Sequence, residues 1–311
     1  MNKKETEVIL QRIEKWYNHL PTLFILEKQN FSAKFGWSKE PTPFSERLSL
    51  DYKSIQEGEE WGKKWESAWF HLEGECPESW DGEIVVTELD FSGEGLVFDT
   101  NGTALQGITN GSIWDPNFAR TRVQILESCK KGEKIELWVE AAANSLFGVF
   151  TDPDPEEESP KRHGWFDAKV ESIKFGKFDK DLWHLYLDVR ILLGLIKRLD
   201  EKSIRRSRAI RTLNHCINVF SNDRNNVQKA RKSLEIELNK KSSASDLSVS
   251  AIGHAHIDTG WLWPVRETVR KCARTFATQL NIIDSYPNYI FGASQPQHYQ
   301  FMKENYPEIY D

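Results

Sequence analysis

The residue types best suited to chemistry gather in one short motif, Gly-His-Ala-His-Ile-Asp-Thr-Gly-Trp-Leu-Trp-Pro, at residues 253–264. His254, His256 and Asp258 stand at alternate positions in it, and alternate side chains leave a strand on the same side. Imidazole nitrogen and carboxylate oxygen both bind divalent cations such as zinc. The spacing therefore predicts a metal site, whereas each of these residues taken alone would favour an ordinary buried or helix-capping role.

The segments around this motif predict a strand, a loop and a helix. Residues 247–252 predict a short strand, and Pro264 stands where a helix can begin without losing a hydrogen bond. Apolar residues then recur at helical spacing as far as Ile283, and residues 289–294 predict the next strand. Residues 247–311 are therefore expected to begin an α/β barrel, a fold that usually needs ~250 residues and keeps its chemistry in the loops after its strands.

The preceding sequence predicts three further parts, so the fold class is α+β and multidomain. Residues 1–46 are expected to form an N-terminal arm with a short helix over residues 6–20. Residues 47–177 contain short alternating runs separated by Asn-Gly and Ser-Gly turns, which predict an antiparallel, jelly-roll-like β-sandwich. Apolar residues in 178–246 recur every three or four positions, which predicts a helical bundle linking the sandwich to the barrel.

Composition excludes several classes of partner. The 311 residues include 41 Lys and Arg against 47 Asp and Glu, a net charge of −6, so we expect neither nucleic acid nor an anionic membrane as a partner. No apolar run could span a bilayer, and the N-terminus lacks the apolar segment of a secretory signal. Four scattered cysteines argue against a disulfide framework or a cysteine metal knuckle. We expect a cytoplasmic protein. The sequence leaves open whether it forms a homo-oligomer.

The motif also carries a family resemblance. Residues 253–264, continued by Arg-Glu-Thr-Val-Arg-Lys-Cys at 266–272, resemble the glycoside hydrolase family 38 α-mannosidases, in particular their cytosolic and bacterial branch. Ser-Gln-Pro-Gln at 294–297 and Gly-Glu-Gly-Leu-Val-Phe at 93–98 add weaker similarities. The resemblance is strongest after residue 247 and looser before it.

This resemblance implies a zinc-dependent retaining exo-α-mannosidase that hydrolyses terminal α-mannosyl residues of oligosaccharides. It implies that His256 and Asp258 bind zinc and that Trp261 packs against the sugar, while His254 takes no assigned role. A metal that holds the 2- and 3-hydroxyls of mannose would select its axial 2-hydroxyl and help the ring to flatten. Because two protein ligands leave zinc short of its usual four, we expect the isolated chain to hold the metal weakly or not at all.

The resemblance also implies that the chain is the N-terminal part of a longer mannosidase. The family's nucleophile and acid/base carboxylates belong to motifs that would lie beyond Asp311, so the 311 residues alone are expected to be inactive. The carboxylates near the C-terminal end, Asp284, Glu304 and Glu308, occupy helical contexts and are expected to be solvated. His298 stands where relatives commonly have Gln, at a place expected to lie past the end of the strand.

Two other functions remain open from the sequence. In an amidohydrolase-type metal hydrolase, His254 and His256 would bind the metal and Asp258 would be a bystander. In a non-catalytic carbohydrate-binding or interface module, the sandwich over residues 48–175 would be the platform and the metal motif would be idle.

Overall fold

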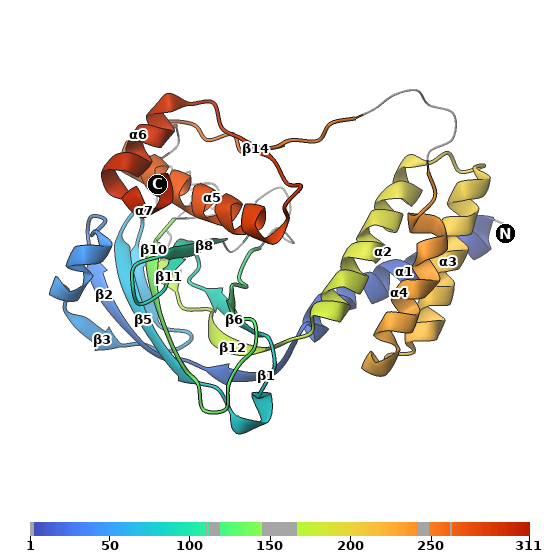
Figure 1. The fold of residues 1–311 in the computed structure, drawn as a ribbon, viewed down its shortest axis with the longest axis horizontal. Coiled ribbons are helices and arrows are strands. Elements are labelled where there is room, and N and C mark those ends of the chain that lie inside the picture. Colours follow the sequence, from blue (N-terminus) through green and yellow to red (C-terminus); the bar gives the residue numbers. More distant parts are fainter. Residues whose placement is uncertain (1–2, 110, 112–118, 145–166, 242–248, 262) are drawn as a thin grey trace, which may run out of the picture. The chain divides into compact units, whose positions relative to one another are not determined.

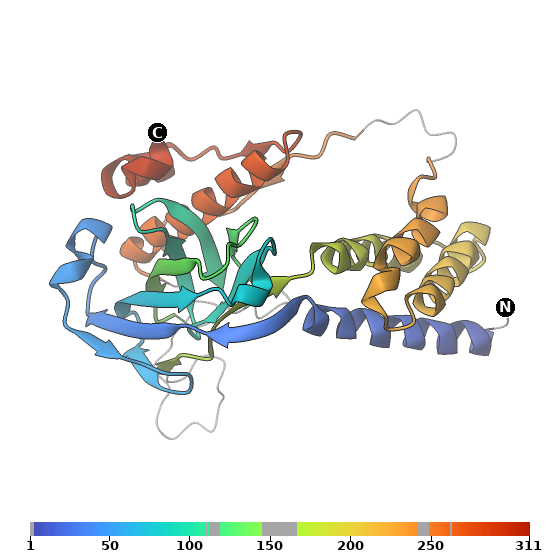
Figure 2. The same ribbon diagram turned by 60° about the horizontal axis from the view of Figure 1, so that its bottom comes forward.

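The computed structural model describes residues 3–109, 111, 119–144, 167–241, 249–261 and 263–311. The chain divides into two compact units, each assembled from two separate stretches. A helical unit comprises Met1–Glu27 with Lys177–Val249, and a β-rich unit comprises Lys28–Gly176 with Ser250–Asp311. Figures 1 and 2 show the elements of each unit in two orientations.

The helical unit contains α1 (Lys3–His19), α2 (Lys180–Arg198), α3 (Ile204–Phe220) and α4 (Val227–Leu238). Apolar side chains spaced by three and four residues give each helix one buried stripe, as the sequence predicts for α2, α3 and α4. Asp179 caps α2 by accepting a hydrogen bond from the Leu182 amide, and Ser203 caps α3 in the same way. The shared core also includes Ile13 and Trp16, so α1 packs within this bundle.

Two sheets form most of the β-rich unit. Within each sheet, the neighbouring strands whose register the structure defines run antiparallel. The larger sheet has the strand order β3-β2-β5-β10-β7-β8, and the smaller has the order β1-β12-β6-β9. The strands of the larger sheet are β2 (Ser32–Ser38), β3 (Tyr52–Ser54), β5 (Ser67–Glu75), β7 (Glu94–Phe98), β8 (Ala104–Thr109) and β10 (Lys134–Ala142). The strands of the smaller sheet are β1 (Ile25–Asn30), β6 (Val85–Asp90), β9 (Gln124–Leu126) and β12 (Ser172–Phe178). A separate two-stranded sheet pairs β4 (Glu60–Lys63) with β11 (Asp167–Lys169).

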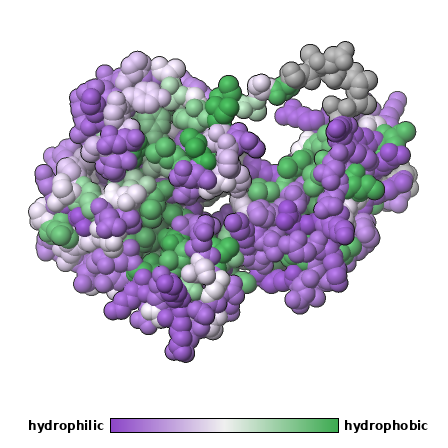
Figure 3. Space-filling model, in the orientation of Figure 1, coloured by the Kyte–Doolittle hydropathy of each residue, from purple (hydrophilic) through white to green (hydrophobic). Residues whose placement is uncertain are grey.

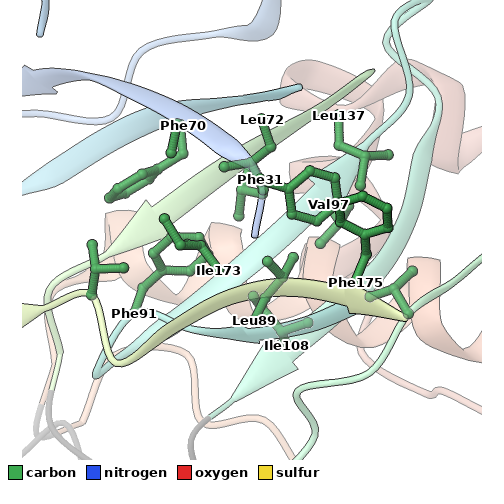
Figure 4. Packing of buried hydrophobic residues seen from close by; sticks show 14 of the residues in the cluster. Phe31, Phe70, Leu72, Leu89, Phe91, Val97, Ile108, Leu137, Ile173 and Phe175 are labelled. Carbon is green, nitrogen blue, oxygen red and sulfur yellow. The ribbon is translucent and has the colours of Figure 1, made fainter. Parts of the chain in front are cut away.

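The core of the β-rich unit lies between these two sheets. Phe70 and Leu72 of β5 meet Ile173 and Phe175 of β12 there, and Figure 4 shows these side chains interdigitating with their neighbours. Because side chains alternate along a strand, Trp69 of β5 points to the opposite face of the larger sheet and joins a separate apolar cluster. The larger sheet is therefore buried on both faces.

The strands β1 and β2 lie within residues 1–46, the stretch that the sequence assigns to an arm. β2 pairs with β5 along its whole length, from Ser32 to Ser38. Its buried positions are taken by the small residues Ala33 and Gly36, with exposed Lys34 and half-buried Phe35 between them. Small residues give a weak hydrophobic pattern, which is why the alternation is hard to recognise in the sequence.

The C-terminal segment covers the second face of the larger sheet. It contains β13 (Gly253–His254), α5 (Val265–Ser285), β14 (Phe291–Gly292), α6 (Pro296–Asn305) and α7 (Pro307–Tyr310). Figure 1 shows α5 lying over β8 and β10, and Cys272, Ala273 and Ala277 of α5 pack with Trp69 and Phe98 of the sheet. The helix approaches β8 so closely that the Gly107 amide donates a hydrogen bond to the Thr278 hydroxyl, at 3.0 Å.

Residues 247–311 are expected to be the beginning of a barrel, and no barrel is seen in the part of the chain that the structure describes. β13 and β14 pair in parallel on either side of α5, as successive barrel strands would, but the pairing involves only Gly253–Phe291 and His254–Gly292. The strand predicted at residues 247–252 is wrong for residues 249–252, and residues 247 and 248 lie outside the described part. In this segment only Gly253 and His254 pair with another strand. Residues 249–252 have no paired neighbour, so they do not form a strand of a sheet.

The surface seen in Figure 3 is mainly hydrophilic, interrupted by smaller hydrophobic areas. Across the described residues, no helix combines the length and the apolar composition needed to cross a membrane.

Candidate functional site

The candidate site lies in the segment that joins β13 to α5. We call residues 255–264 the motif loop, of which the structure describes all but residue 262. In it the Nε2 atom of His256 lies 3.1 Å from the Oδ1 atom of Asp258. Both side chains face solvent, with 75% of the His256 side chain and 41% of the Asp258 side chain exposed. The loop therefore presents one nitrogen and one oxygen donor side by side.

The pair has donor types that zinc accepts, and its contact has the length of a hydrogen bond or ion pair. Bonds of ~2.0–2.2 Å in a tetrahedral shell place two donor atoms roughly 3.4 Å apart, close to the 3.1 Å separation of His256 and Asp258. Within the described ranges, no group of three or more His, Cys, Asp or Glu side chains is placed to hold a metal ion. These two residues thus fit half of a tetrahedral shell.

His254 does not join the pair, so the predicted convergence of three residues is wrong. His254 belongs to β13, whereas residues 255–258 follow the strand in irregular conformation. The rule that alternate side chains share a side holds only along a strand. The structure therefore brings together two of the three residues.

Two tryptophans follow the pair. The Trp261 and Trp263 rings meet edge to face, with centroids 5.5 Å apart, and 56% of Trp261 is exposed. Gly260 between Asp258 and Trp261 has φ +75°, a conformation that favours glycine. Trp263 lies beneath the ammonium group of Lys271, 4.7 Å from its ring centroid. The loop thus combines a His–Asp pair with a partly exposed tryptophan.

The hydroxyl of Thr268 ties the motif loop to α5. It accepts hydrogen bonds from the Gly260 amide at 2.9 Å and the Trp263 indole at 3.0 Å, and donates to the Asp258 carbonyl at 3.2 Å. A hydroxyl has one donor and two acceptor sites, so its full capacity is used here. Thr268 itself is completely buried in the first turns of α5.

A second support comes from α6. The Thr259 hydroxyl lies 3.0 Å from Nε2 of His298 and 3.2 Å from Oε1 of Gln295. His298 lies past the end of β14, as expected, and within α6, where it is only 4% exposed. Burial lowers the pKa of its imidazole. The motif loop is thus fixed on both sides, by Thr268 and by the pair His298 and Gln295.

Several charged side chains are buried where α5 packs against the larger sheet. The Arg270 guanidinium donates to the Glu267 carboxylate and to the Ser67 hydroxyl of β5, the latter at 2.7 Å. Arg274 donates to Glu267 at 2.6 Å and to Glu94 of β7 at 2.9 Å. These ion pairs fix the start of α5, and with it Thr268, to the sheet.

The carboxylates in this network have shifted pKa values. Burial raises the pKa of Glu94 and Glu267, but their arginine and lysine neighbours outweigh burial, so both pKa values are lower than usual. Glu140 of β10 is different, because burial outweighs the charge of Arg270 and its pKa is raised. The Tyr306 hydroxyl donates to Glu140 at 2.8 Å.

The remaining carboxylates near the C-terminal end, Asp284, Glu304 and Glu308, are exposed, as expected. Sequence reasoning missed Thr268, and it placed His298 outside the site. Thr268 carries a usable signal, since a threonine in the first turns of a helix that follows a loop is well placed to bond that loop. His298 lies too far along the chain for local spacing to connect it with Thr259.

Two family models match the chain. "Alpha-mannosidase, jelly roll domain" matches residues 29–170, and "Glycosyl hydrolases family 38 N-terminal domain" matches residues 246–311. The first covers most of the strands of the β-rich unit, and the second begins just before the motif. A solved structure of a β-glucuronidase from Ruminococcus gnavus aligns over 50% of this chain and 30% of its own, at 12% identity and a TM-score of 0.32.

Curated relatives span nearly the whole chain. Alpha-mannosidase G of Dictyostelium discoideum is 32% identical over 99% of the chain, and alpha-mannosidase 2C1 of Homo sapiens is 31% identical over 87%. An alpha-mannosidase of Saccharomyces cerevisiae is 29% identical over 84%. The chain spans only 29%, 25% and 24% of these three proteins, respectively. From the two family matches and these relatives, the chain belongs to the glycoside hydrolase family 38 α-mannosidases and corresponds to their N-terminal portion.

Proposed function

We propose that the whole protein is a zinc-dependent retaining exo-α-mannosidase that removes terminal α-mannosyl residues from oligosaccharides. His256 and Asp258 would supply two zinc ligands, and Trp261 would supply an apolar face for the sugar ring. The observation that carries this proposal is the 3.1 Å contact between His256 and Asp258, inside the motif that the family 38 domain matches.

Each group has a defined task in this proposal. Zinc would supply a Lewis acid able to hold neighbouring hydroxyls of mannose. His256 and Asp258 would hold the metal at an open position, where both side chains face solvent. Trp261 would contact the C–H face of the ring and limit its orientations, a role suited to an exposed aromatic side chain.

The two carboxylates needed for the retaining reaction belong elsewhere in the whole protein. A retaining glycosidase uses a nucleophile and an acid/base group roughly 5 Å apart. Asp284, Glu304 and Glu308 lie exposed on or beside helices, outside the motif loop, and are poor candidates for that pair. The 311 residues would accordingly supply two ligands of the metal and one contact for the sugar, without completing the reaction.

The amidohydrolase alternative is less well supported. It requires His254 and His256 as the ligand pair, whereas the contact in the structure joins His256 to Asp258. In the whole protein, His256→Ala and Asp258→Ala should each abolish cleavage of an aryl α-mannoside, as should chelation of the metal. His254→Ala is the matched control and should retain most of the activity. Full activity in Asp258→Ala with loss in His254→Ala would reverse the assignment.

We also propose that the protein works in a reducing compartment such as the cytoplasm. Cys76, Cys129, Cys216 and Cys272 are all buried and unpaired, an arrangement typical of cytosolic proteins. Separating cell fractions and detecting the protein tests this. Its presence in a secreted fraction would contradict the proposal.

A further inference from the structure

Thr268 occupies an unusual position for a buried helix residue. Its hydroxyl contacts three groups of the motif loop, and these groups belong to Asp258, Gly260 and Trp263. Asp258 is itself a residue of the proposed site, Gly260 directly precedes Trp261, and the ring of Trp263 contacts the ring of Trp261. One side chain from outside the loop thus connects the metal-ligand end of the loop to its aromatic end.

The place of this hydroxyl is fixed by the helix that carries it. Thr268 follows Glu267 and precedes Arg270, both of which are buried in the ion-pair network on the sheet. Arg270 also reaches Ser67 of β5, so this turn of α5 is attached to the larger sheet. The motif loop, by contrast, has irregular conformation over residues 255–258. A fixed point on the helix can therefore impose order on the loop.

We propose that Thr268 is a positioning residue that fixes the conformation of the motif loop and thereby the orientation of Asp258 and Trp261. The expected effect on metal binding rests on the proposed function, because the orientation of Asp258 matters only if that residue binds a metal. The loop geometry itself is independent of that function. Groups that orient metal ligands typically contribute 10–100-fold to metal affinity.

The chain contains a matched control for this residue. Thr278 lies on the same helix and is also buried, at 6% exposure. Its hydroxyl accepts from the Gly107 amide at 3.0 Å and donates to the Arg274 carbonyl at 2.7 Å, and neither partner belongs to the motif loop. Thr268→Val and Thr278→Val remove the same hydroxyl from two buried sites of α5. Only the first change should affect the loop.

Amide hydrogen exchange of the 311-residue chain tests the proposal without metal. The Gly260 amide and the Trp263 indole proton should be protected in the wild type and in Thr278→Val. Both should exchange at least roughly tenfold faster in Thr268→Val, because their shared acceptor is gone. Thr268→Ser keeps the hydroxyl and should restore protection. Unprotected protons in the wild type, or equal exchange in Thr268→Val, would overturn the inference whether or not a variant is less stable.

A second measurement connects loop order with the metal. In a competition titration of the whole protein with a chromophoric chelator, Thr268→Val should weaken zinc binding by roughly tenfold, while Thr268→Ser and Thr278→Val should stay close to the wild type. If zinc binding is unaffected by His256→Ala, the proposed function fails, yet the exchange result still decides the role of Thr268. If exchange changes but zinc affinity in Thr268→Val does not, Thr268 orders the loop without orienting the ligand, and the proposal is wrong.

Discussion

Gly107 of β8 and the backbone of Arg274 in α5 are in direct contact. A Cβ atom built on Gly107 would lie 2.8 Å from both the Cβ atom and the carbonyl oxygen of Arg274. Real Cβ atoms essentially never come this close to another heavy atom, so glycine is required for the helix to lie against the sheet. The apolar surface between α5 and the sheet depends on this approach.

Gly107→Ala should therefore destabilise the β-rich unit. Overpacking of this kind costs about 1–3 kcal/mol, because helix and sheet must separate. Urea unfolding measures the difference in free energy. Gly62→Ala in β4 is the control, because the nearest atom to its added Cβ would be 3.5 Å away, an ordinary contact. Equal stability of the two variants would mean that α5 does not hold this position in solution.

Arg270→Met should lower the free energy of unfolding by about 3–5 kcal/mol, because it removes one of the two arginines that neutralise the buried Glu267 carboxylate. Arg270 and Glu267 are each almost fully buried. Lys131→Met is a control for losing an ion pair, since Lys131 and Glu78 are largely exposed and such pairs contribute little. A change in Arg270→Met as small as that in Lys131→Met would contradict the buried network.

Stability should fall on acidification in a manner that depends on Glu94. Its pKa is lower in the folded chain than the ordinary 4.5, so its contribution is full above that value and is lost as the pH falls below it. Glu267 acts in the same direction, whereas the raised pKa of Glu140 partly opposes both. Glu94→Gln should flatten the dependence of the unfolding free energy on pH between 7 and 3. Glu78→Gln, at an exposed site, should leave the slope unchanged; a similar slope in Glu94→Gln and the wild type would refute the assignment.

The buried cysteines should be unreactive in the folded chain. Burial raises the pKa of the Cys76, Cys216 and Cys272 thiols to about 12, so the reactive thiolate is scarce near neutral pH. Iodoacetamide at pH 7.5 should modify these three only after denaturant is added, as followed by mass spectrometry. Rapid labelling of the native chain at any of the three would show that its surroundings open in solution.

The regular elements could be predicted where one side of an element is strongly apolar. The stripe through Leu182, Leu185 and Val189 gives α2 almost its observed limits, and alternation gives β6, β7 and β10. The same reasoning failed for β2, whose buried positions hold small residues. It also assigned α1 to an arm, because a short amphipathic helix does not reveal which surface it covers.

The site could be predicted only in part, for a different reason. The motif identifies His256 and Asp258, because their spacing is local. Their supports depend on tertiary contacts, since His298 meets Thr259 across 39 positions and Arg274 meets Glu94 across 180. A buried network of arginine and glutamate also runs against the usual rule that charged residues are exposed. Sequence patterns thus indicate the donors but not the structure that orients them.

His256 and Asp258 are proposed to hold a divalent metal together. Zinc titration of the ¹⁵N-labelled chain, with the histidine ring nitrogens observed by NMR, tests this proposal most directly. The expected result is a zinc-dependent shift of the His256 Nε2 signal that disappears in Asp258→Ala, while the His254 ring signals stay in place. A shift confined to His254, or a His256 shift of equal size in the wild type and Asp258→Ala, would contradict the claim.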